Sequence, residues 1–317
     1  MKNLQKLFVP FAFALAFTVS FSSCKKDDPV AAPKDITAVA IADPQFSTLV
    51  AALTKAELVT TLQTAGPFTV FAPNNAAFTK AGITSLDNQT KASLTPILTT
   101  HVLSGTVRAA DVRSGTAKTV NNTNDIYLSK NADGVFINGN IKVIATDITA
   151  SNGVVHVIDN VIIPPTANIV DVATSPVNRA NFTELVELVG LAGLGSTLSS
   201  ATAKGYTVFA PTNTAFQELY RGVGTSKATL TAPANRGLLT RVLLYHVIRD
   251  RVFSTDLPNV GTAEVETAST TTTDRLTFDL AGGAKVKGKT SGNSNIITAN
   301  ILATNGVVHV IDKVLIP

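Results

Sequence analysis

Apolar residues recur with helical spacing in four stretches of the chain. Residues 46–53 carry them at positions i, i+3, i+4 and i+7, and residues 182–189 repeat this pattern. Such a stripe predicts an amphipathic helix that buries one face against a core. Residues 94–101 and 239–246 carry a second pair of stripes, each ending in a histidine. Because a proline is tolerated only in the first turn of a helix, we expect Pro96 to lie in the first turn of the helix that carries the 94–101 stripe.

Short apolar stretches between the helical stripes have the character of buried strands. Residues 68–72 and 206–210 form the clearest pair. Each is followed by a proline, at Pro73 or Pro211, which should end the strand because proline cannot donate to a β-ladder. Much of the remaining sequence alternates between apolar and polar residues, as half-buried strands do.

Two Asn-Gly pairs predict tight turns between strands. Asn152-Gly153 and Asn305-Gly306 each precede an apolar run. Asn-Gly favours a two-residue hairpin in which both central residues have positive φ. We therefore expect a hairpin at each pair.

The chain repeats itself. The sequence TVFAP stands at residues 69–73 and again at 207–211, and NGVVHVID stands at 152–159 and again at 305–312. Eight identical residues in the same order indicate a duplicated unit, and repeats of this kind define the architecture before local structure does.

The repeats define two domains of one fold class. We place the first domain at residues 35–164 and the second at 168–317, and we predict an α+β fold for each, a β-sandwich with helices packed beside it. The second copy is longer, and we expect its extra residues in surface loops at 222–234 and 267–273.

The repeated sequences resemble the motifs of the fasciclin domain family. One motif is TVFAP followed by an Asn and by Ala-Phe; the other is the NGVVHVID stretch with its apolar continuation to a proline. The family also carries a Tyr-His pair between these motifs, matched by Tyr245-His246, whereas the first copy has Thr100-His101. The resemblance covers about residues 35–317. It implies the β-sandwich fold and a role in adhesion to cells, matrix or surface polymers.

The first residues have the pattern of an export signal. Lys2 and Lys6 precede an apolar stretch at 7–21 that is shorter than the ~20 residues of a membrane-spanning helix. Small residues then lead to Cys24, the only cysteine. We interpret residues 1–23 as a lipoprotein signal peptide; an ordinary signal peptide with an incidental cysteine is the alternative.

Cys24 would then carry the lipid that holds the mature chain at a membrane. Residues 24–34 read as a lipidated tether, rich in Pro and Ala. The stretch Lys-Lys-Asp-Asp at 25–28 resembles the surface-export tag of Bacteroidetes lipoproteins. We therefore expect an exported protein anchored to the outer membrane and exposed at the cell surface.

The overall charge gives no reason to expect a nucleic-acid partner. The formal net charge is +4, and loss of Lys2 and Lys6 with the signal peptide would leave +4 − 2 = +2. The basic residues are also scattered along the chain. Nucleic-acid-binding domains usually show a concentrated basic patch instead.

The four histidines occupy equivalent places in the two copies, which raises the question of catalysis or metal binding. His156 and Asp159 stand three residues apart on a predicted strand, so their side chains should point to opposite faces. The sequence contains none of the common zinc-ligand spacings and no nucleophile elbow. We expect a non-enzymatic protein without metal or cofactor; an enzyme whose site assembles from scattered residues is the alternative.

We assign these histidines and the Asn-Gly pairs a structural role in each copy. Histidines at the end of apolar helical stripes or on apolar strands are expected to be buried and hydrogen-bonded. The residues in this structural set are His101, His156, His246, His309, Asn152, Gly153, Asn305 and Gly306.

The family resemblance also supplies candidate adhesion contacts. In animal relatives, segments with Asp-Ile and with Tyr-His take part in integrin recognition, which here corresponds to Asp147-Ile148 and Tyr245-His246. The expected partner is an extracellular or envelope protein. Polysaccharide is the alternative, and since the chain has no Trp, Tyr127 and Tyr220 are the aromatic residues we would test for it.

Overall fold

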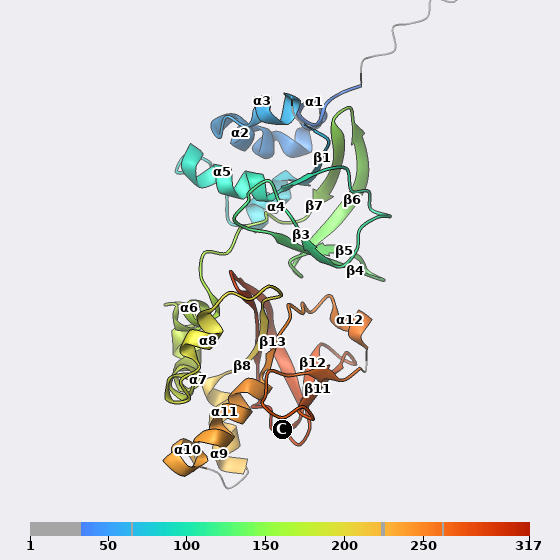
Figure 1. Ribbon diagram of the computed structural model, residues 1–317. Coiled ribbons are helices and arrows are strands. Elements are labelled where there is room, and N and C mark those ends of the chain that lie inside the picture. The colour runs from blue at the N-terminus through green and yellow to red at the C-terminus, as the bar shows by residue number, and fades with distance from the viewer. Residues whose placement is uncertain (1–32, 65, 223–225, 262) are drawn as a thin grey trace, which may run out of the picture. The chain divides into compact units, whose positions relative to one another are not determined.

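The computed structural model describes residues 33–64, 66–222, 226–261 and 263–317 of the chain. The expected signal peptide, Cys24 and most of the tether lie outside these residues. Two α+β units follow one another along the described chain, as the repeats predict (Figure 1).

The first unit begins with helices, inserts one strand between α3 and α4, and continues with strands after α5. Its helices are α1 (Ile36–Ala42), the 3₁₀ turn η1 (Pro44–Phe46), α2 (Ser47–Lys55), α3 (Val59–Thr64), α4 (Asn75–Lys80) and α5 (Lys91–Thr100). Its strands are β1 (Phe68–Pro73), β2 (Val102–Ser104), β3 (Gly115–Ala117), β4 (Ile126–Asn131), β5 (Gly134–Ile137), β6 (Ile141–Ala150) and β7 (Gly153–Ile158).

The second unit has the same plan with longer insertions. Its helices are α6 (Ile169–Thr174), α7 (Arg179–Leu191), α8 (Gly195–Ser199), α9 (Asn213–Gly222), α10 (Lys227–Thr231), the 3₁₀ turn η2 (Pro233–Asn235), α11 (Arg236–Tyr245) and α12 (Leu257–Val260). Its strands are β8 (Tyr206–Pro211), β9 (Val247–Ile248), β10 (Val265–Glu266), β11 (Arg275–Asp279), β12 (Lys285–Gly288), β13 (Gly292–Ala303) and β14 (Gly306–Ile311).

Each unit contains one seven-stranded sheet of the same order. The first is β2-β1-β7-β6-β5-β4-β3, and the second is β10-β11-β12-β13-β14-β8-β9, listed from the opposite edge. The two repeated motifs lie side by side as the parallel pair in each sheet, with Thr69 opposite Val154 and Thr207 opposite Val307. The duplicated sequences therefore form the second and third strands from one edge of each sheet.

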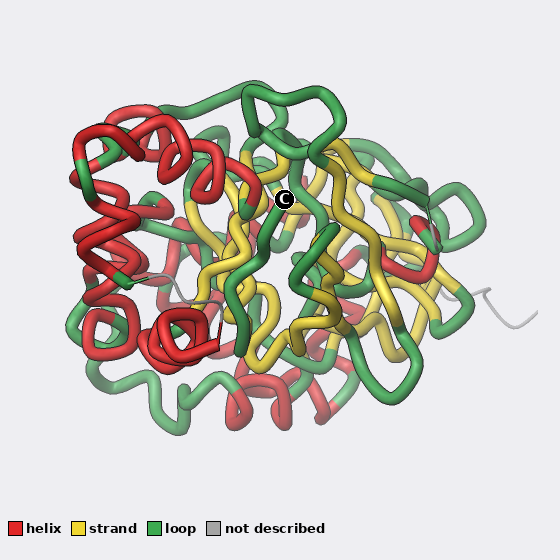
Figure 2. The backbone as a smooth tube through the Cα atoms, turned by 90° about the horizontal axis from the view of Figure 1, so that it is seen from below, coloured by secondary structure: helices red, strands yellow, loops and turns green. Residues whose placement is uncertain are grey.

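Both faces of the parallel strands are buried, which gives each unit two apolar layers, one on each face of these strands. All six residues of β1 are buried. Its Val70 packs with residues of the helices, whereas its Phe71 packs with residues of β4 and β5. Most helices lie to one side of the strands in the view of Figure 2. This arrangement agrees with the predicted β-sandwich with packed helices.

A short helix precedes the predicted amphipathic helix in each unit. The side chain of Asp35 caps α1 by accepting a hydrogen bond from the Ala38 N–H, and Asn168 caps α6 in the same way. These two helices were not predicted, because each has fewer than eight residues, too few to show a clear apolar stripe.

Pro96 corrects the prediction for the helix that carries the 94–101 stripe. It lies in the middle of α5, which spans Lys91–Thr100, and not in the first turn. Proline has no N–H, so the helix continues without the hydrogen bond that residue 96 would donate to the Ala92 carbonyl oxygen. Thr100 and Asn121 both donate to the Pro96 carbonyl oxygen, at 2.7 and 2.8 Å.

The Asn-Gly pairs lie at hairpins, but the predicted turn geometry is wrong. The two residues between β6 and β7 are Ser151 and Asn152, and Gly153 already belongs to β7. Asn152 and Gly306 do not have positive φ. The glycine is required for close packing instead: a Cβ on Gly153 would stand 2.0 Å from the Phe68 carbonyl oxygen.

The asparagine of each pair joins the hairpin to the first helix of its unit. Asn152 Oδ1 accepts from the Ile36 N–H at 3.0 Å, and Asn305 Oδ1 accepts from the Ile169 N–H at 2.9 Å. Each asparagine therefore satisfies a helix N-terminal donor that has no partner inside the helix.

No single helix in the described part of the chain is long and apolar enough to cross a membrane. Only Ile36–Ala42 and Pro44–Lys55 taken together reach that length and composition, and the chain bends by 104° between them.

Candidate functional site

Two of the histidines connect a helix end to the last segment of each unit. His101 is 2% exposed; its Nδ1 donates to the Ile97 carbonyl oxygen, and its Nε2 accepts from the Ile162 N–H. His246 makes the equivalent bonds, to the Val242 carbonyl oxygen and from the Leu315 N–H. Burial lowers the pKa of His101 and of His246 to about 4. Both imidazoles are therefore neutral and fully engaged with the backbone.

The other two histidines each accept a hydrogen bond from a backbone N–H at an irregular position of the neighbouring strand. His156 on β7 donates from Nε2 to the Val107 carbonyl oxygen and accepts the Asp147 N–H at Nδ1, at 3.2 Å. His309 accepts the Asn300 N–H in the same way, at 3.3 Å. Asp147 and Asn300 have φ of 60° and 62°, a conformation that L-residues rarely adopt. A buried histidine thus fixes the backbone of an equivalent residue in each unit.

These left-handed residues belong to bulged strands. The pairing of β6 with β7 shifts register twice, between Val143 and Ala145 and again between Ala145 and Ile148. β13 carries the same two shifts. Because a bulge adds a residue to one strand, it turns a side chain away from the regular alternation. Ala145 is exposed as a result, although Ile141 and Val143 before it at alternate positions are buried. Ile144 is 50% exposed at a regular outward position, beside the exposed Ala145.

We refer to residues 144–147 as the bulge surface. It presents an apolar side chain, Ile144, next to the half-buried carboxylate of Asp147, which accepts a hydrogen bond from the Ala109 N–H. Ile148, the second residue of the candidate Asp-Ile pair, is also half-buried and packs against the first apolar core. The structure therefore places Asp147 at the surface and Ile148 partly beneath it.

The second unit uses its equivalent residues differently. Ile297 is exposed like Ile144, but Asn300 is 4% exposed. The Asn300 side chain donates to the Gly139 carbonyl oxygen and to Asn140 Oδ1. Only the first unit leaves its left-handed residue accessible.

Ile144 is not among the contact residues predicted from the sequence. The signal was present, because Val143 and Ile144 are adjacent apolar residues that break the alternation of the strand. Two adjacent apolar residues also occur in strands buried on both faces, so the break alone does not distinguish a bulge.

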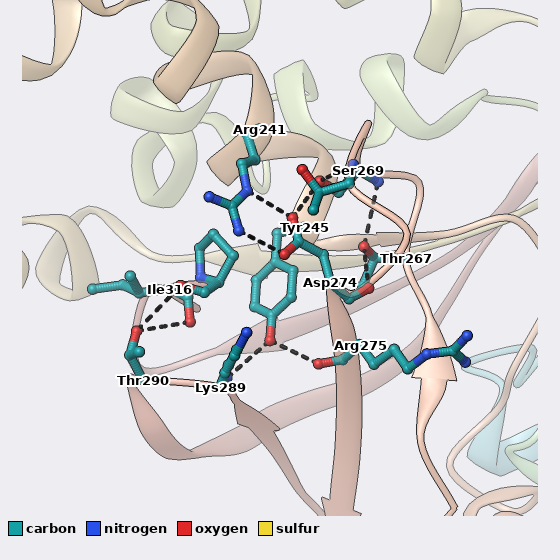
Figure 3. Close-up of polar contacts among 11 residues, drawn as sticks. Arg241, Tyr245, Thr267, Ser269, Asp274, Arg275, Lys289, Thr290 and Ile316 are labelled. Atoms are coloured by element: carbon teal, nitrogen blue, oxygen red, sulfur yellow. Dashed lines mark hydrogen bonds and ion pairs between the residues drawn. The ribbon is translucent and has the colours of Figure 1, made fainter.

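Tyr245 and His246 require a correction as candidate adhesion contacts. Tyr245 is 0% exposed and His246 is 3% exposed, so neither side chain is accessible to a partner in this fold. The Tyr245 hydroxyl donates to the Arg275 carbonyl oxygen and accepts from the Lys289 N–H (Figure 3). The tyrosine fills the core and ties two strands to α11.

The loop at 267–274, where we predicted an insertion, has the same length as the loop at 118–125 of the first unit. An ion pair connects it to α11. The Arg241 guanidinium binds both carboxylate oxygens of Asp274, at 2.8 and 2.7 Å (Figure 3). Ser269 donates to the same carboxylate. Hydrogen bonding from Arg241 lowers the pKa of Asp274 despite its burial. The first unit has Pro96 at the place of Arg241.

The remaining titratable groups near the histidines do not form a catalytic pair. Asp159 accepts the Lys142 N–H and pairs with Lys80 at 2.7 Å, whereas His156 bonds elsewhere. Within the residues that the structure describes, no group of three or more His, Cys, Asp or Glu side chains is arranged to hold a metal ion.

The two candidate tyrosines for sugar binding are half-buried. Tyr127 packs against Phe253 with ring centroids 5.0 Å apart. The Tyr220 hydroxyl donates to Glu184, at 2.6 Å. Of the two, Tyr127 also lines a polar cavity of about 260 Å³.

Comparison with protein families identifies the duplicated unit. The fasciclin domain model matches residues 44–164 and 180–317, which together make up most of the chain. The chain belongs to the fasciclin domain family. Each fasciclin unit described above thus corresponds to one matched region.

Several fasciclin relatives align with one or both units. Protein sll1483 of Synechocystis is 42% identical over 134 residues, covering 41% of this chain and 73% of that protein. The rabbit transforming growth factor-beta-induced protein ig-h3 is 27% identical over 282 residues, covering 86% of this chain. Human periostin is 28% identical over 271 residues. The chain spans only 36% and 28% of these two animal proteins, respectively.

A solved structure is also similar to the chain. The FAS1 domain pair from the insect cell adhesion molecule fasciclin I has 18% sequence identity and a TM-score of 0.44, covering 86% of this chain and 97% of that one.

Proposed function

We propose that the chain is an exported, lipid-anchored adhesion protein whose first fasciclin unit binds an extracellular or envelope protein. The observation that carries the proposal is the bulge surface, where Ile144 is half-exposed next to the carboxylate of Asp147. Interfaces combine an apolar contact with a few polar groups that fix orientation. Membership of the fasciclin domain family, with relatives such as the transforming growth factor-beta-induced protein ig-h3 and periostin, adds support at the level of the family.

The buried histidine beneath this surface supports a binding role. His156 fixes the backbone of Asp147 through a hydrogen bond to its N–H, and Ala145 and Ile148 on either side of the second register shift pair with β7. A surface held rigidly before binding loses less conformational entropy when a partner docks. The histidine would act as a positioning residue for the contact surface and not as a group that carries chemistry.

The membrane anchor is the second part of the proposal. Cys24 follows the apolar segment and would accept the lipid, leaving residues 25–34 as a tether ahead of the first unit. Metabolic labelling with an alkyne fatty acid should mark the wild-type protein, and Cys24→Ala should abolish the label. Protease treatment of intact cells should degrade the labelled protein, if it faces outward.

The binding proposal is tested with residues 34–317, a compact part of the chain that contains both fasciclin units. The fragment is immobilised and exposed to envelope extract from the native cells, before and after protease treatment of the extract. We expect capture that protease treatment abolishes and that free wild-type fragment competes away. Capture that survives protease and disappears after periodate oxidation of glycans would contradict a protein partner.

Polysaccharide binding is the alternative, and the polar cavity beside Tyr127 favours it. Asn124, Asp125 and Arg251 contribute to its lining. The buried Nε of Arg251 makes no hydrogen bond with the described residues. Such donors and acceptors beside an aromatic ring suit a sugar. A glycan array that responds to the wild type and to Tyr220→Phe, but not to Tyr127→Ala, would establish this reading.

A further inference from the structure

The helical layer of the second unit covers an apolar cavity of about 230 Å³. Its walls come from α6, α7 and α8 on one side and from β8, β14 and α11 on the other (Figure 1). Aliphatic side chains form most of the wall, among them Ile169, Leu185, Val186, Val189, Leu198 and Val308.

The cavity has almost no polar character. His246 is the only lining residue with a polar side chain. Both of its ring nitrogens already bond to the backbone, at the Val242 carbonyl oxygen and the Leu315 N–H. A ligand inside the cavity would therefore meet hydrocarbon and no free hydrogen-bonding group. Water is a poor occupant of such a space, because it needs two to four polar partners.

The first unit provides an internal comparison. The equivalent cavity lies between the same elements, beside His101 instead of His246, and has a volume of about 20 Å³. The same fold in the same chain can therefore close this space.

Smaller side chains in the second unit contribute to the larger cavity, and two of these exchanges are the following. Leu53 and Val189 stand seven residues after the equivalent residues Phe46 and Phe182, and Val59 and Gly195 stand thirteen residues after them. The second unit thus has the smaller side chain at both positions. A Cβ placed on Gly195 would meet no atom within 4 Å, which shows the space that the first unit fills with valine.

The cavity also opens at the surface of the helical layer. Val170, Ala173 and Val189 line it and are half-buried. Their counterparts Thr37, Ala40 and Leu53 in the first unit are buried. The second unit therefore offers an apolar entrance between α6, α7 and α8, whereas the first does not.

We propose that this cavity binds a single hydrocarbon chain, such as the alkyl chain of a fatty alcohol, fatty acid or lipid. The apolar lining recognises the chain, and the half-exposed entrance leaves a polar head in water. The volume is adequate, because an apolar cavity of about 150 Å³ in another protein binds benzene. The hydrocarbon has two possible sources, a free small molecule or a membrane lipid, and the tests below distinguish them.

Titration of residues 34–317 with 1-octanol tests the proposal, followed by ¹³C NMR of the Val and Leu methyl groups. We expect saturable shifts at Val186, Val189 and Leu198 with one octanol bound per chain. The methyl groups of Leu49 and Leu53 in the first unit should not move. An absence of saturable shifts up to the solubility limit of octanol would overturn the proposal.

The variant Val189→Leu/Gly195→Val introduces the side chains of the first unit. It should weaken octanol binding at least tenfold while the thermal midpoint stays equal or rises, since the added groups fill empty space. The matched control is Val177→Leu, which enlarges a valine that is 85% exposed and should leave binding unchanged. Undiminished binding in the filled variant would contradict the assigned site.

Competition with phosphatidylcholine vesicles identifies the source of the hydrocarbon that the cavity binds. If vesicles compete with octanol for the wild type and do not bind the filled variant, the ligand is a membrane lipid. If octanol binds and vesicles do not compete, the cavity takes a free molecule.

Discussion

The guanidinium of Arg241 donates two hydrogen bonds to the carboxylate of Asp274, whose side chain is 0% exposed. This contact ties α11 to the loop that precedes β11. It exists only in the second unit, because the first has Pro96 at the corresponding place, where the Pro96 carbonyl oxygen accepts hydrogen bonds from Thr100 and Asn121. The equivalent helices α5 and α11 are thus held by different residues in the two units.

Replacing Asp274 should therefore destabilise the second unit. Asp274→Ala removes the partner of Arg241 and of Ser269, and we expect a loss of about 1–3 kcal/mol in the free energy of unfolding. The lower part of the range reflects the partial exposure of Arg241, which can still reach water. Urea unfolding measures the effect. Lys118→Ala, which breaks the ion pair of Lys118 with Asp125 at the surface, is the control and should cost less than about 1 kcal/mol.

The glycines that begin β7 and β14 should tolerate no side chain. Gly153→Ala would place a Cβ 2.0 Å from the Phe68 carbonyl oxygen, and Gly306→Ala would place one 2.2 Å from that of Tyr206. We expect each change to lower the unfolding free energy by roughly 3 kcal/mol, because the parallel strands must move apart. Gly237→Ala in α11 meets no neighbour within 4 Å and should be neutral or slightly stabilising. Equal stabilities for all three variants would contradict the close-approach explanation.

The buried histidines should make the fold sensitive to mild acid. Burial lowers the pKa of His101, His246 and His309 to about 4, whereas an unfolded histidine titrates near 6.5. Between these values the unfolded chain binds more protons, so the free energy of unfolding falls as the pH drops. We expect a loss on the order of 1–2 kcal/mol per histidine between pH 7.5 and pH 5. Urea midpoints that stay constant or rise on acidification would count against this account.

Tyr245→Phe separates the structural role of the tyrosine from an adhesive one. The change leaves the Arg275 carbonyl oxygen and the Lys289 N–H without the bond that the hydroxyl provides, and we expect a cost of about 1–3 kcal/mol. Binding to the captured partner should not change below the unfolding temperature. A variant that keeps full stability and loses binding would return Tyr245 to the contact surface.

Sequence patterns predicted the architecture well, because duplication and apolar periodicity are properties of long segments. The repeated TVFAP and NGVVHVID stretches predicted two like units. In each unit the two stretches lie in the two neighbouring strands that pair in parallel. The helical stripes at 46–53 and 182–189 correspond to α2 and α7. The burial of the four histidines agrees with their apolar surroundings in sequence.

Details that depend on contacts between distant segments were not accessible from sequence. Asn152-Gly153 has the composition of a positive-φ turn, yet its glycine is required by a strand that is far away in the chain, at Phe68. Tyr245 was grouped with adhesion contacts because of a family resemblance, and its burial follows from packing against residues of distant strands, among them Phe278 and Val286. The two bulges that follow Val143 are not specified by any local pattern.

The bulge surface can be tested most directly by a matched pair of substitutions. Ile144→Lys and Ile297→Lys place the same charge at equivalent, half-exposed positions of the two units. The dissociation constant of each variant for the partner captured from the envelope is compared with that of the wild type, once circular dichroism shows both folded. The account predicts at least tenfold weaker binding for Ile144→Lys and an unchanged constant for Ile297→Lys. Unchanged binding by Ile144→Lys would contradict it.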